Sequence, residues 1–173
     1  LARKRYPRLW ISRLRDASML TLLLNTGLRV GELCAFNLGD LQLSERKGSV
    51  TVPSGKGQKQ RLVPLNAEVR IILQQWMIYR PVVETSALFT GQRNERVTAR
   101  SVQRAVARLA EAAGLSGVTP HVLRHTFAKS LLDSGVGIEK VAALLGHSDL
   151  NTTRIYITPS EGDLEEAVKQ LKI

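Results

Sequence analysis

The chain has 173 residues, enough for one domain with a sizeable core and too short for a second full domain. Its 25 Lys and Arg residues outnumber 15 Asp and Glu residues, and the formal net charge of +10 favours a polyanionic partner, with nucleic acid as the first candidate. An anionic membrane surface is the weaker candidate, because no segment is long and apolar enough to span a bilayer and the basic residues are scattered.

The first fifteen residues hold six Lys and Arg residues and no acidic residue. This charge predicts a basic linker or tail over residues 1–15, which is either solvated or in contact with phosphates. The abrupt opening at Leu1 suggests a fragment of a longer protein. An apolar helix is expected over residues 14–24, ended by Asn25, Thr26 and Gly27.

The next helix is predicted to open at Arg29, and Glu32 lies three residues on, where it can pair with Arg29 on one helical face. Cys34 follows in the segment GELCAF, which reads as a buried helix face, so we interpret the thiol as packing rather than as a nucleophile. A single cysteine excludes an internal disulfide and suits a reducing compartment, and no signal peptide is visible.

Alternating apolar and polar residues predict a small antiparallel sheet with strands over residues 41–43, 49–52 and 61–64. The connection between the last two strands reads SGKGQ and places Lys56 between two glycines. From the pattern alone, Lys56 is best interpreted as a solvated hairpin tip.

Two more helices are expected before the last third of the chain. Residues 67–77 form an amphipathic pattern to which we assign no chemistry, and residues 88–89 a short buried piece. The helix over residues 98–113 carries Arg100, Arg104 and Arg108 on one face, which is either a solvated stripe or, as we favour, one that follows a DNA backbone.

The stretch from Thr119 to Tyr156 brings three histidines, Arg124 and a tyrosine together over short helices. Thr119 and Pro120 are typical of a helix start, which places His121 and Arg124 near an N-terminus that favours anions.

A helix over residues 138–145 should end at Gly146 and leave His147 in the following turn, and residues 151–158 carry Tyr156. Taken singly, His147 would be an ordinary turn histidine and Tyr156 a half-buried core residue. His121 and His125 could form a metal pair, but Arg124 between them makes a cation site unfavourable, and no glutamate is present there.

Four segments together resemble the catalytic domain of the tyrosine recombinases, the phage-integrase family, with an Xer-like character. They are NTGLRVGEL, GKGQKQRLVPL, PHVLRHTFA and VAALLGHSDLNTTRIY, in the right order over nearly the whole chain. The resemblance implies a mainly α fold with a small antiparallel sheet. It places the catalytic domain over residues 16–159 and a C-terminal helix, which docks on a neighbouring subunit, over residues 160–173.

The resemblance also implies roles for the basic residues. Arg29 and Arg124 would grip the scissile phosphate, because a planar guanidinium presents a fork that matches two phosphate oxygens. Glu32 would support Arg29 without touching DNA. Lys56 would protonate the leaving 5′ oxygen from a mobile hairpin, with Lys59 as the runner-up.

In the same reading, Tyr156 attacks the phosphate and stays attached as a 3′-phosphotyrosine, and the 5′-hydroxyl of another strand reverses the step. A free phenol has a pKa of about 10, so Tyr156 needs a base or cationic surroundings. His121 would be that base, His121 and His147 would donate to the phosphate oxygens, and His125 would be structural. The covalent link keeps the bond energy, so no metal, ATP or other cofactor is expected.

The implied partners are double-stranded DNA and further recombinase subunits in a tetrameric synapse, with no membrane. The resemblance implies that full-length relatives carry an N-terminal DNA-clamping domain, which we expect to lie outside this sequence. We also expect a bacterial cytoplasmic protein that associates with the nucleoid when it acts. Two alternatives stay open: a type IB topoisomerase-like enzyme that reseals the same strand, and a DNA-binding module that has lost catalysis.

Overall fold

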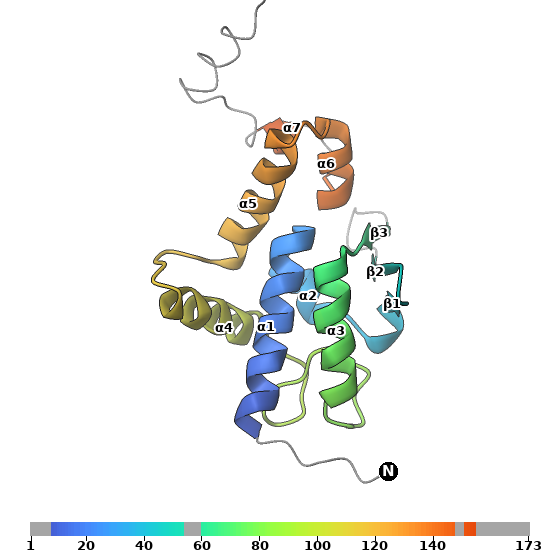
Figure 1. Ribbon diagram of the computed structural model, residues 1–173, viewed down its shortest axis with the longest axis vertical. Coiled ribbons are helices and arrows are strands. Elements are labelled where there is room, and N and C mark those ends of the chain that lie inside the picture. Colours follow the sequence, from blue (N-terminus) through green and yellow to red (C-terminus); the bar gives the residue numbers. More distant parts are fainter. Residues whose placement is uncertain (1–7, 54–59, 148–150, 155–173) are drawn as a thin grey trace, which may run out of the picture.

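The computed structural model describes residues 8–53, 60–147 and 151–154, and it has the predicted mainly helical architecture with one small sheet (Figure 1). None of the helices in these residues is long and apolar enough to cross a membrane. In chain order the elements are α1 (Arg8–Thr26), α2 (Val30–Ala35), the 3-10 turn η1 (Leu38–Asp40), β1 (Leu41–Leu43), β2 (Gly48–Val52), β3 (Arg61–Pro64), α3 (Ala67–Tyr79), α4 (Ala99–Ala112), α5 (Pro120–Asp133), α6 (Ile138–Leu145) and α7 (Asn151–Arg154).

Helix α1 is the centre of the fold, because it packs against α3, α4 and α5. Leu22 and Leu23 of α1 are fully buried beside Leu73 and Trp76 of α3 and Phe89 of the following loop. Trp76 and Phe89 stack with ring centroids 5.9 Å apart. As Figure 1 shows, the C-terminal end of α1 lies close to α5 and α6. The packing of α1 in the core therefore positions the chain where the predicted site residues meet.

The start of α1 differs from its prediction. The helix begins at Arg8 rather than at residue 14, so residues 8–15 of the predicted basic linker form its first turns. Ile11 and Leu14 pack against the core, and Arg15 bonds the buried Asp16 at 2.7 Å and the carbonyl of Thr90 at 3.0 Å. In the sequence, the many basic residues around these positions masked their apolar and ion-pairing pattern, and the helix start was therefore predicted too late.

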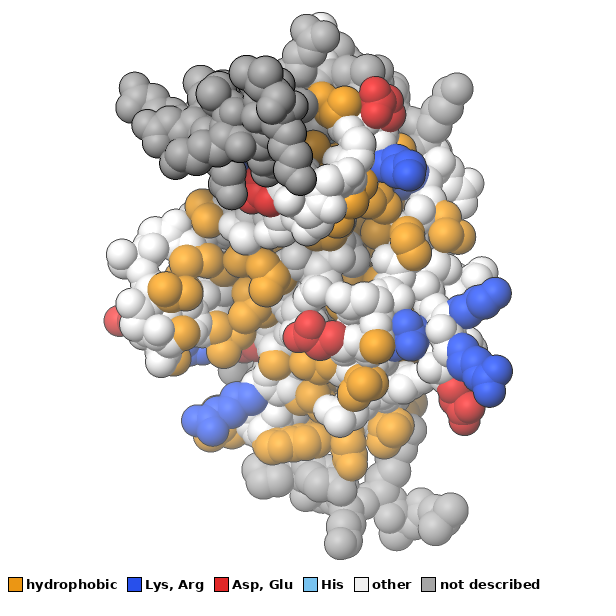
Figure 2. All heavy atoms as spheres, turned by 45° about the horizontal axis from the view of Figure 1, so that its top comes forward, with side chains coloured by type: hydrophobic (Ala, Val, Ile, Leu, Met, Phe, Trp, Pro, Cys, Tyr) orange, Lys and Arg blue, Asp and Glu red, His pale blue; other side chains and the backbone are white. Residues whose placement is uncertain are grey.

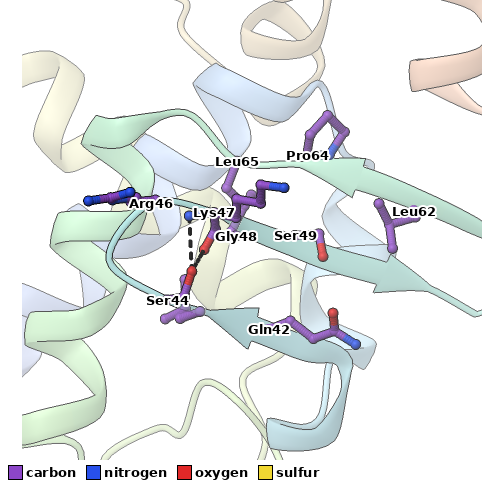
Figure 3. A pocket seen from close by; sticks show the side chains of 10 residues that line it. Gln42, Ser44, Arg46, Lys47, Gly48, Ser49, Leu62, Pro64 and Leu65 are labelled. Atoms are coloured by element: carbon purple, nitrogen blue, oxygen red, sulfur yellow. Dashed lines mark hydrogen bonds between the residues drawn. The ribbon is translucent and has the colours of Figure 1, made fainter.

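The sheet has the predicted strands in the order β1-β2-β3, all antiparallel. Val50 and Val63 face each other across it and are buried against the helices. On the outer face, Gln42, Ser49 and Pro64 lie in adjacent positions and help to line an open hollow of about 610 Å³ (Figure 3). Among the residues that the structure describes, none of the predicted catalytic residues lines this hollow.

Gly27 lets α1, α5 and α6 meet. Its φ of +62° is in the left-handed region, and a Cβ there would lie 2.4 Å from Cδ1 of Phe127 and 2.7 Å from Cδ2 of Leu145. Both the backbone conformation and the close approach therefore require glycine.

We expect Gly27→Ala to destabilise the protein much more than Gly114→Ala, measured as the free energy of unfolding in urea. Gly114 has a φ of +73° but open space around its Cβ position, so its substitution should cost only the backbone strain, about 1–2 kcal/mol. Gly27→Ala should add about 1–3 kcal/mol because Phe127 and Leu145 must move. Equal losses for the two variants would contradict the packing argument.

Candidate active site

Arg124 is the most deeply buried of the predicted catalytic residues that the structure describes. It lies on α5, whose start is capped as predicted by the side chain of Thr119, which accepts from the backbone N–H of Val122. Only 4% of Arg124 is exposed, and its guanidinium donates to the carbonyl of Gly27 at 2.6 Å and to that of Leu145 at 2.9 Å. These contacts fix the guanidinium between the end of α1 and the end of α6.

The C-terminal end of α6 is fully hydrogen-bonded, and that explains the position of His147. Gly146 has the predicted left-handed conformation, with a φ of +69°. The backbone N–H groups of His147 and Gly146 donate back to the carbonyls of Ala142 and Ala143 at 3.0 and 3.2 Å, which is the Schellman arrangement. The next two carbonyls accept from Arg61 and Arg124, so both arginines hold the helix end from which His147 projects.

His147 is an acceptor toward Arg124 in this geometry. Its Nε2 lies 2.8 Å from Nη2 of Arg124, and a guanidinium can only donate, so Nε2 carries no proton. Nδ1 then carries the proton of the neutral ring and donates to Oγ1 of Thr153 at 2.8 Å. Burial, followed by the positive charges of Arg124, Arg29 and Arg61, lowers the pKa of His147 to about 4.

Glu32 pairs with two arginines: with Arg29, as predicted, and also with Arg61. The expected contact with Arg29 is present, with Nη1 3.2 Å from Oε1, and the backbone N–H of Arg29 donates to Oε2 at 2.8 Å. Arg61 donates to both carboxylate oxygens at 2.9 Å. Burial raises the pKa of Glu32, but the hydrogen bonds and charges of Arg61 and Arg29 outweigh it, so the pKa lies below its usual value and the carboxylate stays ionised.

Arg61 was not predicted as a site residue, because Lys56 was the residue singled out in the segment GKGQKQRLVPL. A signal was present, since Arg61 and Val63 stand two residues apart on one strand and Val63 faces the core. A charged residue at an inward position requires a partner. Its partners here are Glu32 and the carbonyl of Leu144, 3.0 Å from Nε.

The remaining candidates lie apart from this cluster or outside the described residues. His121 is exposed in the first turn of α5, where no described contact joins it to Arg124 or His147. Lys56, its alternative Lys59 and Tyr156 all lie outside the described residues. Their roles remain predictions.

Cys34 is half-buried against the core, and burial raises the pKa of its thiol while Arg96 opposes the rise. A protonated, packed thiol agrees with the structural interpretation of this residue.

The arginines of α4 do not behave as one uniform stripe. Arg100, Arg104 and Arg108 are all exposed, as their spacing predicts, but Arg108 pairs with the buried carboxylate of Asp16 on α1. Arg108 therefore contributes to holding α4 on α1. On the face drawn in Figure 2, the Lys and Arg side chains of the described residues are scattered among exposed hydrophobic ones.

The model of the phage integrase family matches residues 10–162. The chain belongs to this family. Among its integrase relatives, "Tyrosine recombinase XerC" of Corynebacterium efficiens is 42% identical over 90% of this chain and 50% of the relative. The XerC protein of Haemophilus ducreyi is 39% identical over 83% of this chain and 47% of the relative. The chain thus spans about half the length of these relatives.

Two solved recombinase structures have the same fold. The XerA recombinase matches with a TM-score of 0.81 and 32% identity over 98% of this chain and 66% of that one. The XerH site-specific recombinase bound to its difH substrate before cleavage matches with a TM-score of 0.78 and 30% identity over 96% of this chain and 49% of that one. The mainly α fold with a small antiparallel sheet is thereby confirmed.

We expect His147 to titrate near pH 4 in an NMR titration of the histidine rings and to show the Nδ1–H tautomer at pH 7. Its folded-state pKa lies below the unfolded value of about 6.5, so the unfolded chain binds the extra proton between the two values. This contribution to stability is complete above pH 6.5 and is lost as the pH falls toward 4. His147→Gln should lack that component in urea unfolding at pH 5 and 7, and a His147 pKa at or above 6.5 would contradict the geometry.

Proposed function

We propose that this chain is the catalytic domain of an Xer-type, site-specific tyrosine recombinase that cleaves and rejoins DNA through a 3′-phosphotyrosine. The observation that carries the proposal is the cluster of Arg29, Arg124 and His147, held by Glu32 and by the end of α6. A concentration of fixed donors is what a phosphoryl-transfer transition state requires, because its negative charge spreads over the equatorial oxygens.

The two arginines would act on the phosphate in different ways. Arg124 is 4% exposed and is fixed by backbone carbonyls. Its N–H groups therefore already have a fixed orientation and need little rearrangement when a phosphate binds. The side chain of Arg29 is 39% exposed and is held on one side by Glu32, which leaves it accessible to a phosphate from solvent. Together they can approach two different oxygens of one phosphodiester.

The proposed cleavage step exchanges one phosphoester for another. The phenolic oxygen of Tyr156 forms a bond to phosphorus while the bond between phosphorus and the 5′ oxygen breaks. His121 accepts the phenolic proton, and Lys56 supplies a proton to the leaving 5′ oxygen. The same number of phosphoester bonds is present before and after, so the reverse attack by a 5′-hydroxyl rejoins the strand without ATP.

The neutral state of His147 refines its role. Nε2 faces Arg124 as an acceptor, so Nε2 can donate to a phosphate only once it carries a proton and no longer accepts from Arg124. A phosphodiester brought between Arg29 and Arg124 supplies the negative charge that favours the imidazolium. We therefore propose that His147 becomes a donor when the substrate arrives.

The partners follow from the same proposal. They are double-stranded DNA, further subunits of the recombinase in a tetramer, and an N-terminal DNA-clamping domain like that implied for full-length relatives. Residues 16–159 would form the catalytic domain, and residues 160–173 a helix that docks on a neighbouring subunit. We place the activity in the bacterial cytoplasm, at the nucleoid.

We expect the wild-type chain, incubated in EDTA with nicked suicide duplexes from its native locus, to form a covalent protein–DNA band on a denaturing gel. Tyr156→Phe should form none, because it lacks the attacking oxygen. Tyr79→Phe is the matched control: this ring packs edge-to-face on Trp10, so losing its hydroxyl should leave the adduct unchanged.

Each other result of this experiment identifies an alternative. DNA binding without any band would favour a module that has lost catalysis, and a band that persists in Tyr156→Phe would refute the nucleophile. Strand connectivity in the products separates the remaining pair, since a type IB topoisomerase-like enzyme rejoins the original strand and a recombinase joins a different one.

We expect DNA binding by this chain to weaken roughly 10- to 1,000-fold between 50 and 200 mM salt, because phosphate contacts release counterions. Arg104→Gln should reduce the slope of the logarithm of affinity against the logarithm of salt concentration by about 1 if α4 follows the DNA backbone. The control is Arg93→Gln, an exposed arginine in the loop before α4. An affinity that is independent of salt would refute the proposed DNA interface.

A further inference from the structure

We propose that Arg61 is a positioning residue that aligns Arg29 and His147 for the reaction without touching DNA; this inference rests on the proposed function. Arg61 is the first residue of β3, and its side chain lies on the inner side of the sheet. It reaches two separate parts of the cluster, the carboxylate of Glu32 and the end of α6.

All three guanidinium nitrogens of Arg61 are engaged within the protein. Nη1 and Nη2 each donate to one oxygen of Glu32 at 2.9 Å, and Nε donates to the carbonyl of Leu144 at 3.0 Å. The side chain is 11% exposed, against 39% for Arg29, the other arginine on the same carboxylate. Of the pair, Arg61 is the internal partner and Arg29 the accessible one.

The orientation of Glu32 therefore depends on Arg61. A bidentate guanidinium–carboxylate pair helps to fix the plane of the carboxylate. Oε1 and Oε2 of Glu32 also accept from the side chain and the backbone of Arg29. Fixing the carboxylate thus fixes the direction from which Arg29 is held.

The second contact, from Nε of Arg61 to the carbonyl of Leu144, links Arg61 to His147. Arg61 and Arg124 occupy successive carbonyls, those of Leu144 and Leu145, at the end of α6. The turn lies directly against Arg61, since a Cβ on Gly146 would be 2.6 Å from its Nη1. A displaced Arg61 would therefore weaken the support of Arg29, through Glu32, and that of the turn that orients His147.

The test compares Arg61→Lys with Arg96→Lys in the full chain. Lysine keeps the charge and loses the bidentate fork. Arg96 is the matched control because it also clamps α2, through the carbonyls of Cys34, Ala35 and Phe36 at 2.8–3.0 Å, but at the end away from Glu32. Melting temperatures show whether each variant is folded.

For Arg61→Lys we expect the rate of covalent adduct formation at saturating DNA to fall about 10- to 100-fold, as a lost charge-assisted contact in the transition state predicts. DNA affinity should change by no more than about threefold, because Arg61 makes no proposed phosphate contact. Arg96→Lys should lower the melting temperature and leave the rate within about twofold of wild type. An Arg61→Lys rate equal to wild type would overturn the inference.

A second measurement needs neither DNA nor activity. The ¹⁵N order parameter of the Arg29 Nε–H group should fall in Arg61→Lys and stay unchanged in Arg96→Lys. If the wild-type chain forms no adduct, the proposed function fails while this NMR result still decides the positioning role. An Arg29 side chain equally ordered in both variants would overturn the inference, whatever the activity.

A double variant tests whether Arg61 acts on Arg29 through Glu32. If Arg61 acts on Arg29 through Glu32, the double variant Arg61→Lys/Glu32→Gln should form adduct no more than about threefold more slowly than Glu32→Gln alone. Fully multiplicative losses would show that Arg61 does not act through Glu32, and would overturn this part of the proposal.

Discussion

Three arginines, Arg29, Arg61 and Arg124, contribute positive charge around one imidazole, and their mutual repulsion is the constraint that the site must satisfy. Glu32 is the carboxylate among them, and it balances two of the charges directly. The third charge, on Arg124, is balanced by carbonyl dipoles at the ends of α1 and α6, where a cation is favourable. His147 responds by staying neutral. The arrangement leaves a positive electrostatic potential at the site, and the negative charge of an incoming phosphate would reduce it.

Much of the fold could be predicted because its signals are local. Thr119 and Pro120 marked the start of α5, Gly146 marked the end of α6, and alternation placed the strands close to their observed limits. The same local rules located Arg29, Arg124 and His147 near helix ends, where charge and capping coincide. Their selection as candidate site residues came from the resemblance of four segments to one family, because each residue taken singly has an ordinary structural interpretation.

The parts that could not be predicted depend on contacts between distant segments. The pair of Arg61 with Glu32 joins β3 to α2, and that of Arg108 with Asp16 joins α4 to α1. Neither partner is identified by spacing along the chain. The acceptor role of His147 likewise follows only once Arg124 is seen beside Nε2. A charge on an inward strand position indicates that a partner exists, but only the fold tells which one.

The bond from Arg124 to the carbonyl of Gly27 joins residues 97 positions apart, and the bond to Leu145 closes a further loop of 21 positions. Such long closures are entropically unfavourable until the intervening chain has folded. During synthesis, the cluster of Arg29, Arg124 and His147 cannot form before α6 and His147 have left the ribosome, although α1 and Arg29 emerged long before. A nascent chain therefore carries the separate parts of the arginine–histidine cluster without the assembled cluster itself.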